Sequence, residues 1–351
     1  PADKIMHNAQ YDLGWIRAMG FEVNGRIIDT MMTAALIDEN RFSYSLNALC
    51  YEYLGKVKSE KLLVESAREF GVDPKAEMWK LPSIYVGPYA SVDAEITLEL
   101  WGHFKTILNS QELWDIWKLE TALLPHLVTM TERGIRVDID QAERTKQALL
   151  KREKDTIKRI KTLTGSNVEI WAAASIAKAF DKAGVAYPKT DKGAPSFTKA
   201  FLTDTDHELP QLIMKARNLN KIQGTFIDSI LRYVHKGKIH SHINQLRSDS
   251  GGTISGRISM NNPNLQQLPS RDPELGPMIR RLFLPNNPEE KWAAIDFSQQ
   301  EPRILVHYSK VFSDYVAQEM PGVEEFVDMY TNDPAADFHT MGSAMAGVPR
   351  K

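Results

Sequence analysis

Three aspartates occupy positions where a carboxylate could bind a metal ion. Asp296 ends the apolar run 292–295 in the segment WAAIDFSQQEPRILVHYS. Asp12 follows a short apolar stretch in HNAQYD, and Asp93 lies four residues after Tyr89 in YASVD. Aspartate oxygens are hard ligands of the kind that Mg²⁺ prefers. Taken singly these signals are weak, because Asp12 could be a helix cap and Tyr89 and Asp93 a surface or core pair.

The elements around Asp296 would present its carboxylate at the end of a strand. Residues 292–295 predict a short buried strand, and the polar residues after Asp296 predict a turn. Pro302 has a fixed φ and no N–H, so it suits the first position of a helix. We therefore expect Glu301 to lie in the turn and not in the helix. In the alternative interpretation, Ser298 and Glu301 form a capping box.

The remaining pattern indicates an α/β region followed by long helices. Tyr89 and Asp93 would share one helix face, because they are one turn apart. Apolar periodicity predicts strands at 4–7, 26–28 and 135–137, and helices at 11–19, 30–37, 46–53, 89–108 and 112–131. A basic helix, capped by Asp138 or Asp140, would end at Leu163. Residues 58–82 are expected to be irregular, residues 186–198 to form a mobile tip, and the chain from 237 onward to form short strands and turns.

Lysine and arginine are concentrated in that basic helix. The net charge of the chain is -2, which by itself does not indicate a nucleic-acid partner. Between residues 144 and 161, however, eight basic residues stand against only Glu153 and Asp155. The eight are Arg144, Lys146, Lys151, Arg152, Lys154, Lys158, Arg159 and Lys161. Such a helix is either a solvated face or a surface that binds phosphates.

A glycine-rich segment, GGTISGRISMNNPNLQQLPSR at 251–271, could also contact nucleic acid. Its glycines allow a partner to approach the backbone closely. Its Arg257, asparagines and glutamines are side chains that hydrogen-bond base edges and phosphates. The alternative is an ordinary loop rich in glycine and asparagine.

The composition is that of a soluble globular protein with two or three domains, at 351 residues, 42% apolar and 25% charged. No apolar run reaches the roughly 18 residues of a membrane span, and no secretory signal is visible. The single cysteine, Cys50, excludes a disulfide framework and suits a reducing cytosol. His240 and His242 could share a strand face, but no third ligand has a suitable spacing, so we predict no metal site there.

The chain resembles the family A, polymerase-I-like, DNA polymerases, and most of all their phage branch. The resemblance is carried by four segments in this order: HNAQYD, YASVD, GGTISGRISMNNPNLQQLP and IDFSQQEPRILVHYS. The resemblance covers essentially the whole chain. It implies an α/β and α+β multidomain fold, with a ribonuclease-H-like 3′–5′ exonuclease domain at 1–112 and a right-hand polymerase domain at 113–351. The palm would comprise 113–137 and 237–315, the thumb 138–236, and the start of the fingers 316–351.

The resemblance also implies roles for particular residues. Asp296 would bind the catalytic Mg²⁺ ions, for which Mn²⁺ could substitute, and Glu301 would exclude a ribose 2′-OH. Gln299 would lie near the primer terminus, and His339 would contact the incoming triphosphate. The exonuclease motifs would be Asn8, Asp12, Tyr89 and Asp93, with Asp12 and Asp93 as metal ligands. DNA contacts would come from Ser255, Arg257, Asn264, Gln266 and Gln267, and from Lys151, Arg152 and Lys158 of a duplex-gripping thumb.

The implied activity is template-directed DNA synthesis with 3′–5′ proofreading in the full-length protein. Primer–template DNA and deoxynucleoside triphosphates would be its substrates, with a processivity factor or a second polymerase polypeptide as a further partner, in the cytoplasm of a host bacterium. The family's first exonuclease motif, fingers helix and second palm motif do not occur here, so we expect a catalytically incomplete fragment. The alternatives are a DNA-binding subunit of a split polymerase and a proofreading exonuclease fragment.

Overall fold

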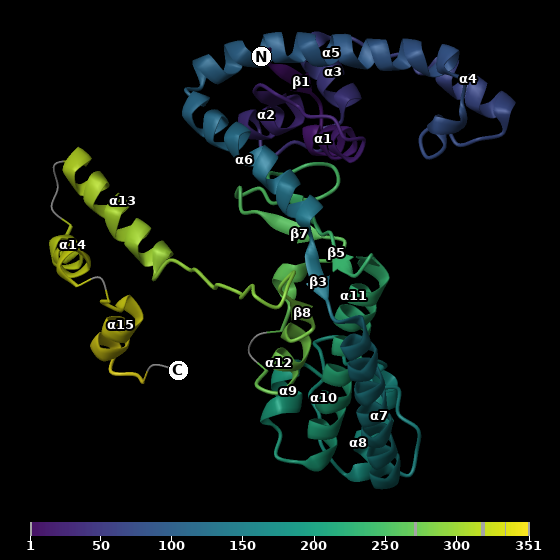
Figure 1. The fold of residues 1–351 in the computed structure, drawn as a ribbon. Coiled ribbons are helices and arrows are strands. Elements are labelled where there is room, and N and C mark those ends of the chain that lie inside the picture. The colour runs from purple at the N-terminus through teal and green to yellow at the C-terminus, as the bar shows by residue number, and fades with distance from the viewer. Residues whose placement is uncertain (1, 270–271, 317–319, 334, 350–351) are drawn as a thin grey trace. The chain divides into compact units, whose positions relative to one another are not determined.

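The computed structural model describes residues 2–269, 272–316, 320–333 and 335–349, which fall into two compact units divided after Asn287 (Figure 1). The first unit contains an N-terminal α/β region, a helical region and small antiparallel sheets. In the second unit, the described residues form three helices. Within the described residues, no helix is both long enough and apolar enough to cross a membrane.

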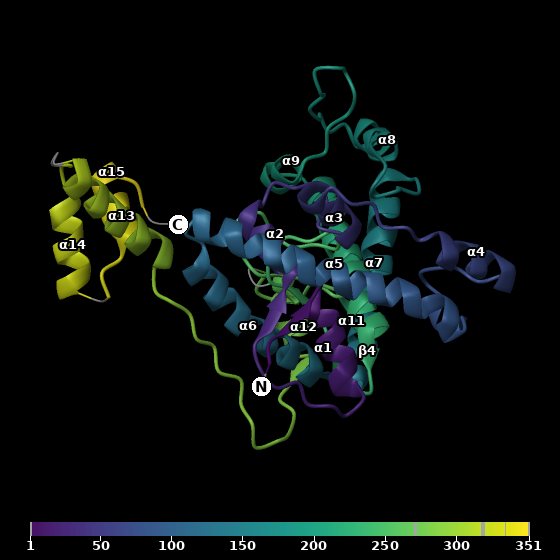
Figure 2. The same ribbon diagram turned by 90° about the horizontal axis from the view of Figure 1, so that it is seen from above.

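The N-terminal region is built on a parallel pair of short strands, β1 (Lys4–Met6) and β2 (Ile27–Asp29). Helix α1 (Ala9–Ala18) connects them, and α2 (Thr30–Ile37) and α3 (Leu46–Leu54) follow. The long helix α5 (Ser83–Ser110) packs across β1, α2 and α3 (Figures 1 and 2). Its buried residues, including Leu100 and Phe104, form one core with Ile28 and Leu49. The predicted strands and helices of this region are confirmed.

The prediction of irregular structure over 58–82 is wrong. Residues Lys61–Phe70 form helix α4, and Met78–Lys80 form a 3₁₀ turn. Leu63 and Ala67 lie one turn apart and are buried, while the charged residues of the helix, Lys61, Glu65, Arg68 and Glu69, are exposed. This narrow apolar stripe is enough to dock the helix, although the segment is polar on average. Helix α5 also begins earlier than predicted and runs through Pro88.

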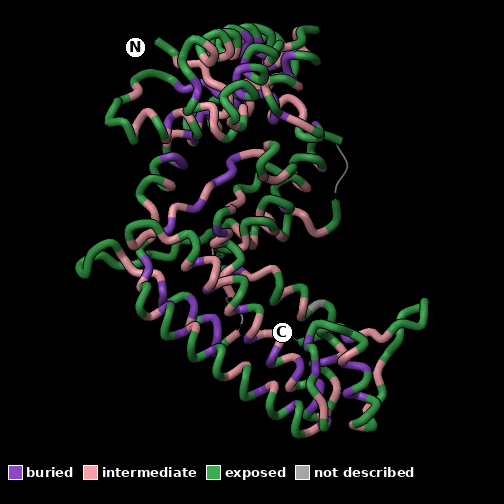
Figure 3. Tube along the Cα trace, turned by 90° about the vertical axis from the view of Figure 1, so that its right-hand side faces the viewer, coloured by how far each residue is buried: buried purple, intermediate pink, exposed green. Residues whose placement is uncertain are grey.

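The helical region consists of α6 (Trp114–Arg133), strand β3 (Ile135–Val137) and the basic helix α7 (Ile139–Thr164). Asp138 caps α7, because its carboxylate accepts the N–H of Gln141 at 2.8 Å. Buried residues recur along α7 at spacings of three, four or seven positions, which keeps them on one face, as the purple segments of the long helices in Figure 3 illustrate. Helices α8 (Ala173–Ala183), α9 (Lys199–Asp204), α10 (Glu208–Lys221) and α11 (Asp228–Tyr233) complete the region, with α10 packed along α7.

The loop predicted at 186–198 is present and closes on itself. Thr190 donates its N–H to the Ala194 carbonyl at 2.8 Å, and Lys189 pairs with Pro195 in an isolated bridge. Beyond α11, β4 (Val234–His235), β5 (Lys238–Ile239), β3 and β8 (Phe283–Leu284) form an antiparallel sheet in that order. Strands β6 (His242–Asn244) and β7 (Ser259–Asn261) form a separate pair, and the short helix α12 (Leu275–Arg280) precedes β8.

The second unit contains α13 (Gln300–Val316), α14 (Val323–Asn332) and α15 (Phe338–Ala346). The strand predicted at 292–295 is not formed, and Ile295 is 94% exposed. A strand of this kind is stable only when another strand pairs with it, and no described segment does so. The position predicted for Glu301 is also wrong, because Glu301 lies in the first turn of α13. Pro302 is tolerated there, since the first N–H groups of a helix have no partner within it.

Candidate functional site

The start of α1 positions the first candidate pair, Asn8 and Asp12. Asn8 has a left-handed backbone, with φ 65°, and immediately precedes the helix, while Asp12 lies in its first turn. The backbone N–H groups of Asn8 and Ala9 donate to the two oxygens of Asp29, at 3.0 and 2.8 Å.

Asp29 joins the N-termini of two helices and was missed by the sequence analysis. Besides the α1 donors, it accepts the N–H groups of Met31 and Met32 at the start of α2, at 2.8 and 3.4 Å. The carboxylate is almost completely buried. Its signal in the sequence was an aspartate placed between a predicted strand and a predicted helix, which is a favourable position for a cap.

Negative charge gathers around this junction. Burial raises the pKa of Asp12, and the charge of Asp29 raises it further. Burial lowers the pKa of His7, although the charges of Asp29, Asp93 and others oppose that shift. The His7 ring is also hydrogen-bonded through Nδ1 to Thr30, at 2.9 Å. The influence of Asp93 on His7 indicates that the α5 pair lies in the same neighbourhood as α1.

Tyr89 and Asp93 lie one turn apart on α5, as predicted, and a third residue joins them. The ammonium of Lys58 forms an ion pair with Asp93 Oδ1 and lies 3.5 Å from the centroid of the Tyr89 ring. Burial lowers the pKa of Lys58, but its interactions with Asp93 and Tyr89 outweigh that effect and leave the pKa raised. Lys58 was not singled out from the sequence, because its partners are distant along the chain.

The described residues do not complete a metal site. Among them there is no group of three or more His, Cys, Asp or Glu side chains arranged to hold a metal ion. Asp12 and Asp93 are chemically suitable oxygen donors, but Asp93 is already paired with Lys58. Asp296 is exposed and lies outside regular secondary structure.

The glycine-rich segment forms a tight loop with an exposed polar surface. Gly252 has φ 94°, and a Cβ there would lie 2.1 Å from the Leu246 carbonyl, so only glycine fits. Asn264 accepts the N–H of Gln266 at 3.0 Å and thereby begins the 3₁₀ turn Leu265–Gln267. Of the predicted DNA contacts in this segment, Ser255, Arg257, Gln266 and Gln267 are exposed and Asn264 is half-buried.

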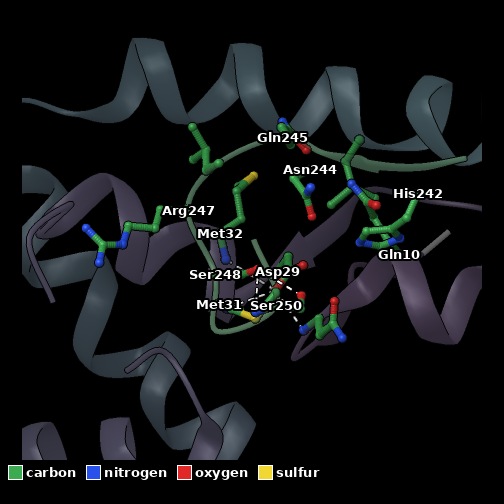
Figure 4. A pocket seen from close by; sticks show the side chains of 13 residues that line it. Gln10, Asp29, Met31, Met32, His242, Asn244, Gln245, Arg247, Ser248 and Ser250 are labelled. Atoms are coloured by element: carbon green, nitrogen blue, oxygen red, sulfur yellow. Dashed lines mark hydrogen bonds between the residues drawn. The ribbon is translucent and has the colours of Figure 1, made fainter. Parts of the chain in front are cut away.

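A small cavity lies where the loop after β6 meets the start of α1 and α2. Figure 4 shows Asn244, Ser248 and Ser250 gathered around Asp29. The cavity volume is about 40 Å³, which suits water and is far too small for a nucleotide. We therefore assign it to packing between the two regions and not to substrate binding.

The basic residues of α7 divide into two sets. Lys146, Arg152 and Arg159 form ion pairs with Asp228, Glu274 and Glu208, at 2.9, 2.8 and 2.7 Å. The other five are exposed, and their spacing of 7, 3, 4 and 3 residues keeps them on one face of the helix. We call this set the α7 stripe: Arg144, Lys151, Lys154, Lys158 and Lys161. Of the three predicted DNA contacts on this helix, Lys151 and Lys158 belong to the α7 stripe, whereas Arg152 is paired with Glu274 and does not.

In the second unit, Gln299 connects two of the predicted nucleotide-site segments. Its Oε1 accepts the N–H of Phe338 at 2.6 Å, and its Nε2 donates to the carbonyl of Ala336. His339 follows directly, in the first turn of α15. The structure thus brings the start of α13, with Gln299 and Glu301, next to the start of α15. Glu301 and His339 are both exposed.

Comparison with known proteins decides the family. Residues 139–330, more than half of the chain, match the model for DNA polymerase family A, and residues 1–109 match the model for 3′-5′ exonuclease. The chain belongs to DNA polymerase family A. The predicted family and fold class are confirmed, whereas the domain boundaries and the roles of individual residues remain predictions.

Several relatives of this family A chain come from phages. It is 35% identical to a DNA-directed DNA polymerase of Pseudomonas phage M6, over 99% of this chain and 54% of that protein. It is 33% identical to the DNA polymerase DpoZ of Acinetobacter phage SH-Ab 15497, over 99% of this chain and 58% of that protein. The chain thus spans about half the length of the curated relatives it matches.

A solved structure supports the same fold. The POL domain of Pol1 from M. smegmatis, in complex with DNA primer-template and dNTP, superposes with a TM-score of 0.72 and 22% identity. The match covers 98% of this family A chain and 54% of the other.

Proposed function

We propose that this chain is the exonuclease, thumb and first palm portion of a phage DNA polymerase. The protein would add deoxynucleotides to a primer 3′-OH and remove mispaired ones by 3′–5′ hydrolysis, in the cytoplasm of the infected bacterium. The observation that carries the proposal is the order of two matched families on one chain, exonuclease before polymerase. Phage relatives with polymerase names, aligned over 99% of the chain, support it.

On the exonuclease side, α1 and α5 would present Asn8, Asp12, Tyr89 and Asp93 to the 3′ end of a single strand. Divalent cations, Mg²⁺ or Mn²⁺, would supply charge stabilisation at the phosphate when bound. Asp12 and Asp93 are the ligands that we propose from the described residues. The pKa of Asp12 is raised by burial first and by the charge of Asp29 second, and perturbed carboxylates of this kind occur often at functional sites.

On the polymerase side, Asp296 would be a ligand of the catalytic cations, and Glu301 would discriminate against a ribose 2′-OH. His339 would contact the triphosphate of the incoming nucleotide. The hydrogen bonds of Gln299 to residues 336 and 338 support a common site, because they hold the segments of Glu301 and His339 together. Gln299 would thus stabilise the arrangement of these two segments, in addition to its proposed place near the primer terminus.

For DNA binding, we propose that the α7 stripe follows the phosphates of the primer–template. The stripe runs from Arg144 to Lys161, which corresponds to about 26 Å of helix. Ser255, Arg257, Asn264, Gln266 and Gln267 would approach the minor groove from the glycine-rich loop. The exposure of most of these side chains supports such contacts.

The experiment uses a version of the polypeptide extended to the length of its relatives, with Mg²⁺ and a labelled primer–template. Asp296→Asn should abolish extension of a matched primer and leave degradation of a mismatched primer intact. Asp93→Asn should do the reverse. Extension that survives Asp296→Asn, or degradation that survives Asp93→Asn, contradicts the corresponding half of the proposal.

A further inference from the structure

Lys58 is enclosed by the two α5 residues assigned above to the exonuclease site. Its ammonium pairs with Asp93 and lies 3.5 Å from the centroid of the Tyr89 ring. Its side chain is only 2% exposed, whereas that of Asp93 is 27% exposed. A lysine whose charge is removed from water in this way needs compensation, and the carboxylate and the π face provide it.

The chain brings Lys58 there from the segment between α3 and α4. Glu60 lies nearby, with its Oε1 3.7 Å from the Lys58 ammonium, but it also accepts a hydrogen bond from Asn47 at 3.0 Å. Asp93 is the closer carboxylate. Lys58 is therefore directed at Asp93, with Glu60 as a secondary neighbour.

The environment of Asp93 explains why a cation is held there. Its Oδ1 is shielded from water, and the Lys58 ammonium is the partner that the structure shows for it among the described residues. The ion pair with Lys58 is the contact that balances its charge. A divalent cation at the same oxygen would have to replace that ammonium, because the two positive charges repel each other at short distance.

We propose that Lys58 is a positioning residue of the exonuclease site, which holds Tyr89 and Asp93 together and occupies Asp93 until a divalent cation displaces it. The inference rests on the proposed exonuclease function. It adds to that function a competition between an internal ammonium and the metal ion.

The test measures binding of Mn²⁺ to residues 1–351 by electron paramagnetic resonance, without any nuclease assay. Lys58→Met keeps the length of the side chain and removes the charge. In this variant Mn²⁺ no longer has to displace the Lys58 ammonium from Asp93. Mn²⁺ should therefore bind at Asp93 about tenfold more tightly than in the wild type. Asp93→Asn, alone and combined with Lys58→Met, identifies the binding that depends on Asp93.

The matched control is Lys56→Met, two residues away. Lys56 forms an ion pair with Glu99 on the surface, where its side chain is 55% exposed. This variant loses the same charge from the same segment and should bind Mn²⁺ like the wild type. Lys58→Arg, which keeps the positive charge, should also bind like the wild type, and it provides a test if Lys58→Met does not fold.

The outcomes separate this proposal from the proposed function. The proposal is supported if, of the three lysine variants, Lys58→Met alone binds Mn²⁺ more tightly than the wild type and this gain is lost when Asp93→Asn is added. Equal Asp93-dependent binding in the wild type and Lys58→Met overturns the role of Lys58 and leaves Asp93 as a metal ligand. Tighter binding in Lys58→Arg also overturns it, because charge is then not the cause. If Asp93→Asn changes Mn²⁺ binding in no background, the metal role of Asp93 and this proposal both fail.

Discussion

The carboxylate of Asp249 accepts the backbone N–H of Tyr44 at 2.6 Å, and this bond joins the glycine-rich loop region to the exonuclease region. The same carboxylate accepts the hydroxyl of Ser43 at 2.8 Å. Asp249 lies just before Gly251 and Gly252, so the loop proposed to contact the minor groove is anchored to the segment between α2 and α3. The two regions are therefore connected by specific hydrogen bonds as well as by the shared chain.

Replacement of Asp249 by alanine should loosen that anchor. Loss of a hydrogen bond to a charged group costs about 1–2 kcal/mol, so the protection of the Tyr44 amide against hydrogen exchange should fall about tenfold. Asp272→Ala is the control, because the N–H groups that Asp272 accepts among the described residues, those of Glu274 and Leu275, are local. Unchanged protection at Tyr44 in Asp249→Ala would show that the anchor contributes nothing in solution.

Asp29→Ala should destabilise the exonuclease region more than loss of an ordinary helix cap. Asp29 accepts N–H groups from the starts of both α1 and α2, and one cap is typically worth about 1 kcal/mol, so we expect a loss of about 2–4 kcal/mol in the free energy of unfolding. Asp138→Ala, which removes only the cap of α7, should cost about 1 kcal/mol. Urea unfolding followed by circular dichroism compares the two. Equal losses would mean that Asp29 acts on one helix alone.

The stability of the chain should depend on pH through Asp12. Its pKa is raised in the folded state, by burial first and by Asp29 second, so the folded state holds this proton more tightly than the unfolded state. The ionised carboxylate therefore costs stability above the raised pKa, and the cost disappears as the pH falls below the ordinary value of 3.8. Asp12→Asn should be more stable than the wild type at pH 7. If Asp12→Asn were more stable than the wild type by the same amount below pH 3.8, the ionised carboxylate of Asp12 would not be the cause of the difference.

Local pattern was sufficient to predict much of the fold, whereas most of the candidate residues were assigned from the resemblance to family A polymerases. The N-terminal strands, α2, and the cap of α7 by Asp138 depend on periodicity and capping within a few residues, and they are confirmed. The failures have separate physical reasons. Helix α4 is held by a stripe of only a few buried residues, and the strand at 292–295 lacked a pairing partner. Glu301 was misplaced because a proline in the first helical turn needs no N–H.

The arrangement of the site required contacts that local pattern cannot provide. Lys58 meets Tyr89 and Asp93 only after α3 and α5 have packed, and Asp29 reaches Asn8 across the parallel strand pair. The two sets of basic residues on α7 could not be separated either, since the acids that pair with Arg152 and Arg159 come from α12 and α10 and their surroundings. Tertiary packing thus decides which charges remain available for a ligand.

The last prediction follows from that division of α7. Neutralising three lysines of the stripe, Lys151, Lys154 and Lys158, to glutamine should weaken binding of residues 1–351 to primer–template DNA. Each lost phosphate contact removes about 0.9 from the slope of log K against log salt, so the slope should become less steep by about 3.

The control for this prediction removes the same charge elsewhere. Lys61, Lys75 and Lys105 are exposed lysines of the exonuclease region, and their change to glutamine should leave the slope within about one unit of the wild type. Fluorescence anisotropy over a salt titration measures all three proteins. If both triple variants flatten the slope equally, binding follows net charge and the stripe has no special role. A shift confined to the α7 variant instead places the phosphates along this helix face, because only contacts that release counterions change the slope.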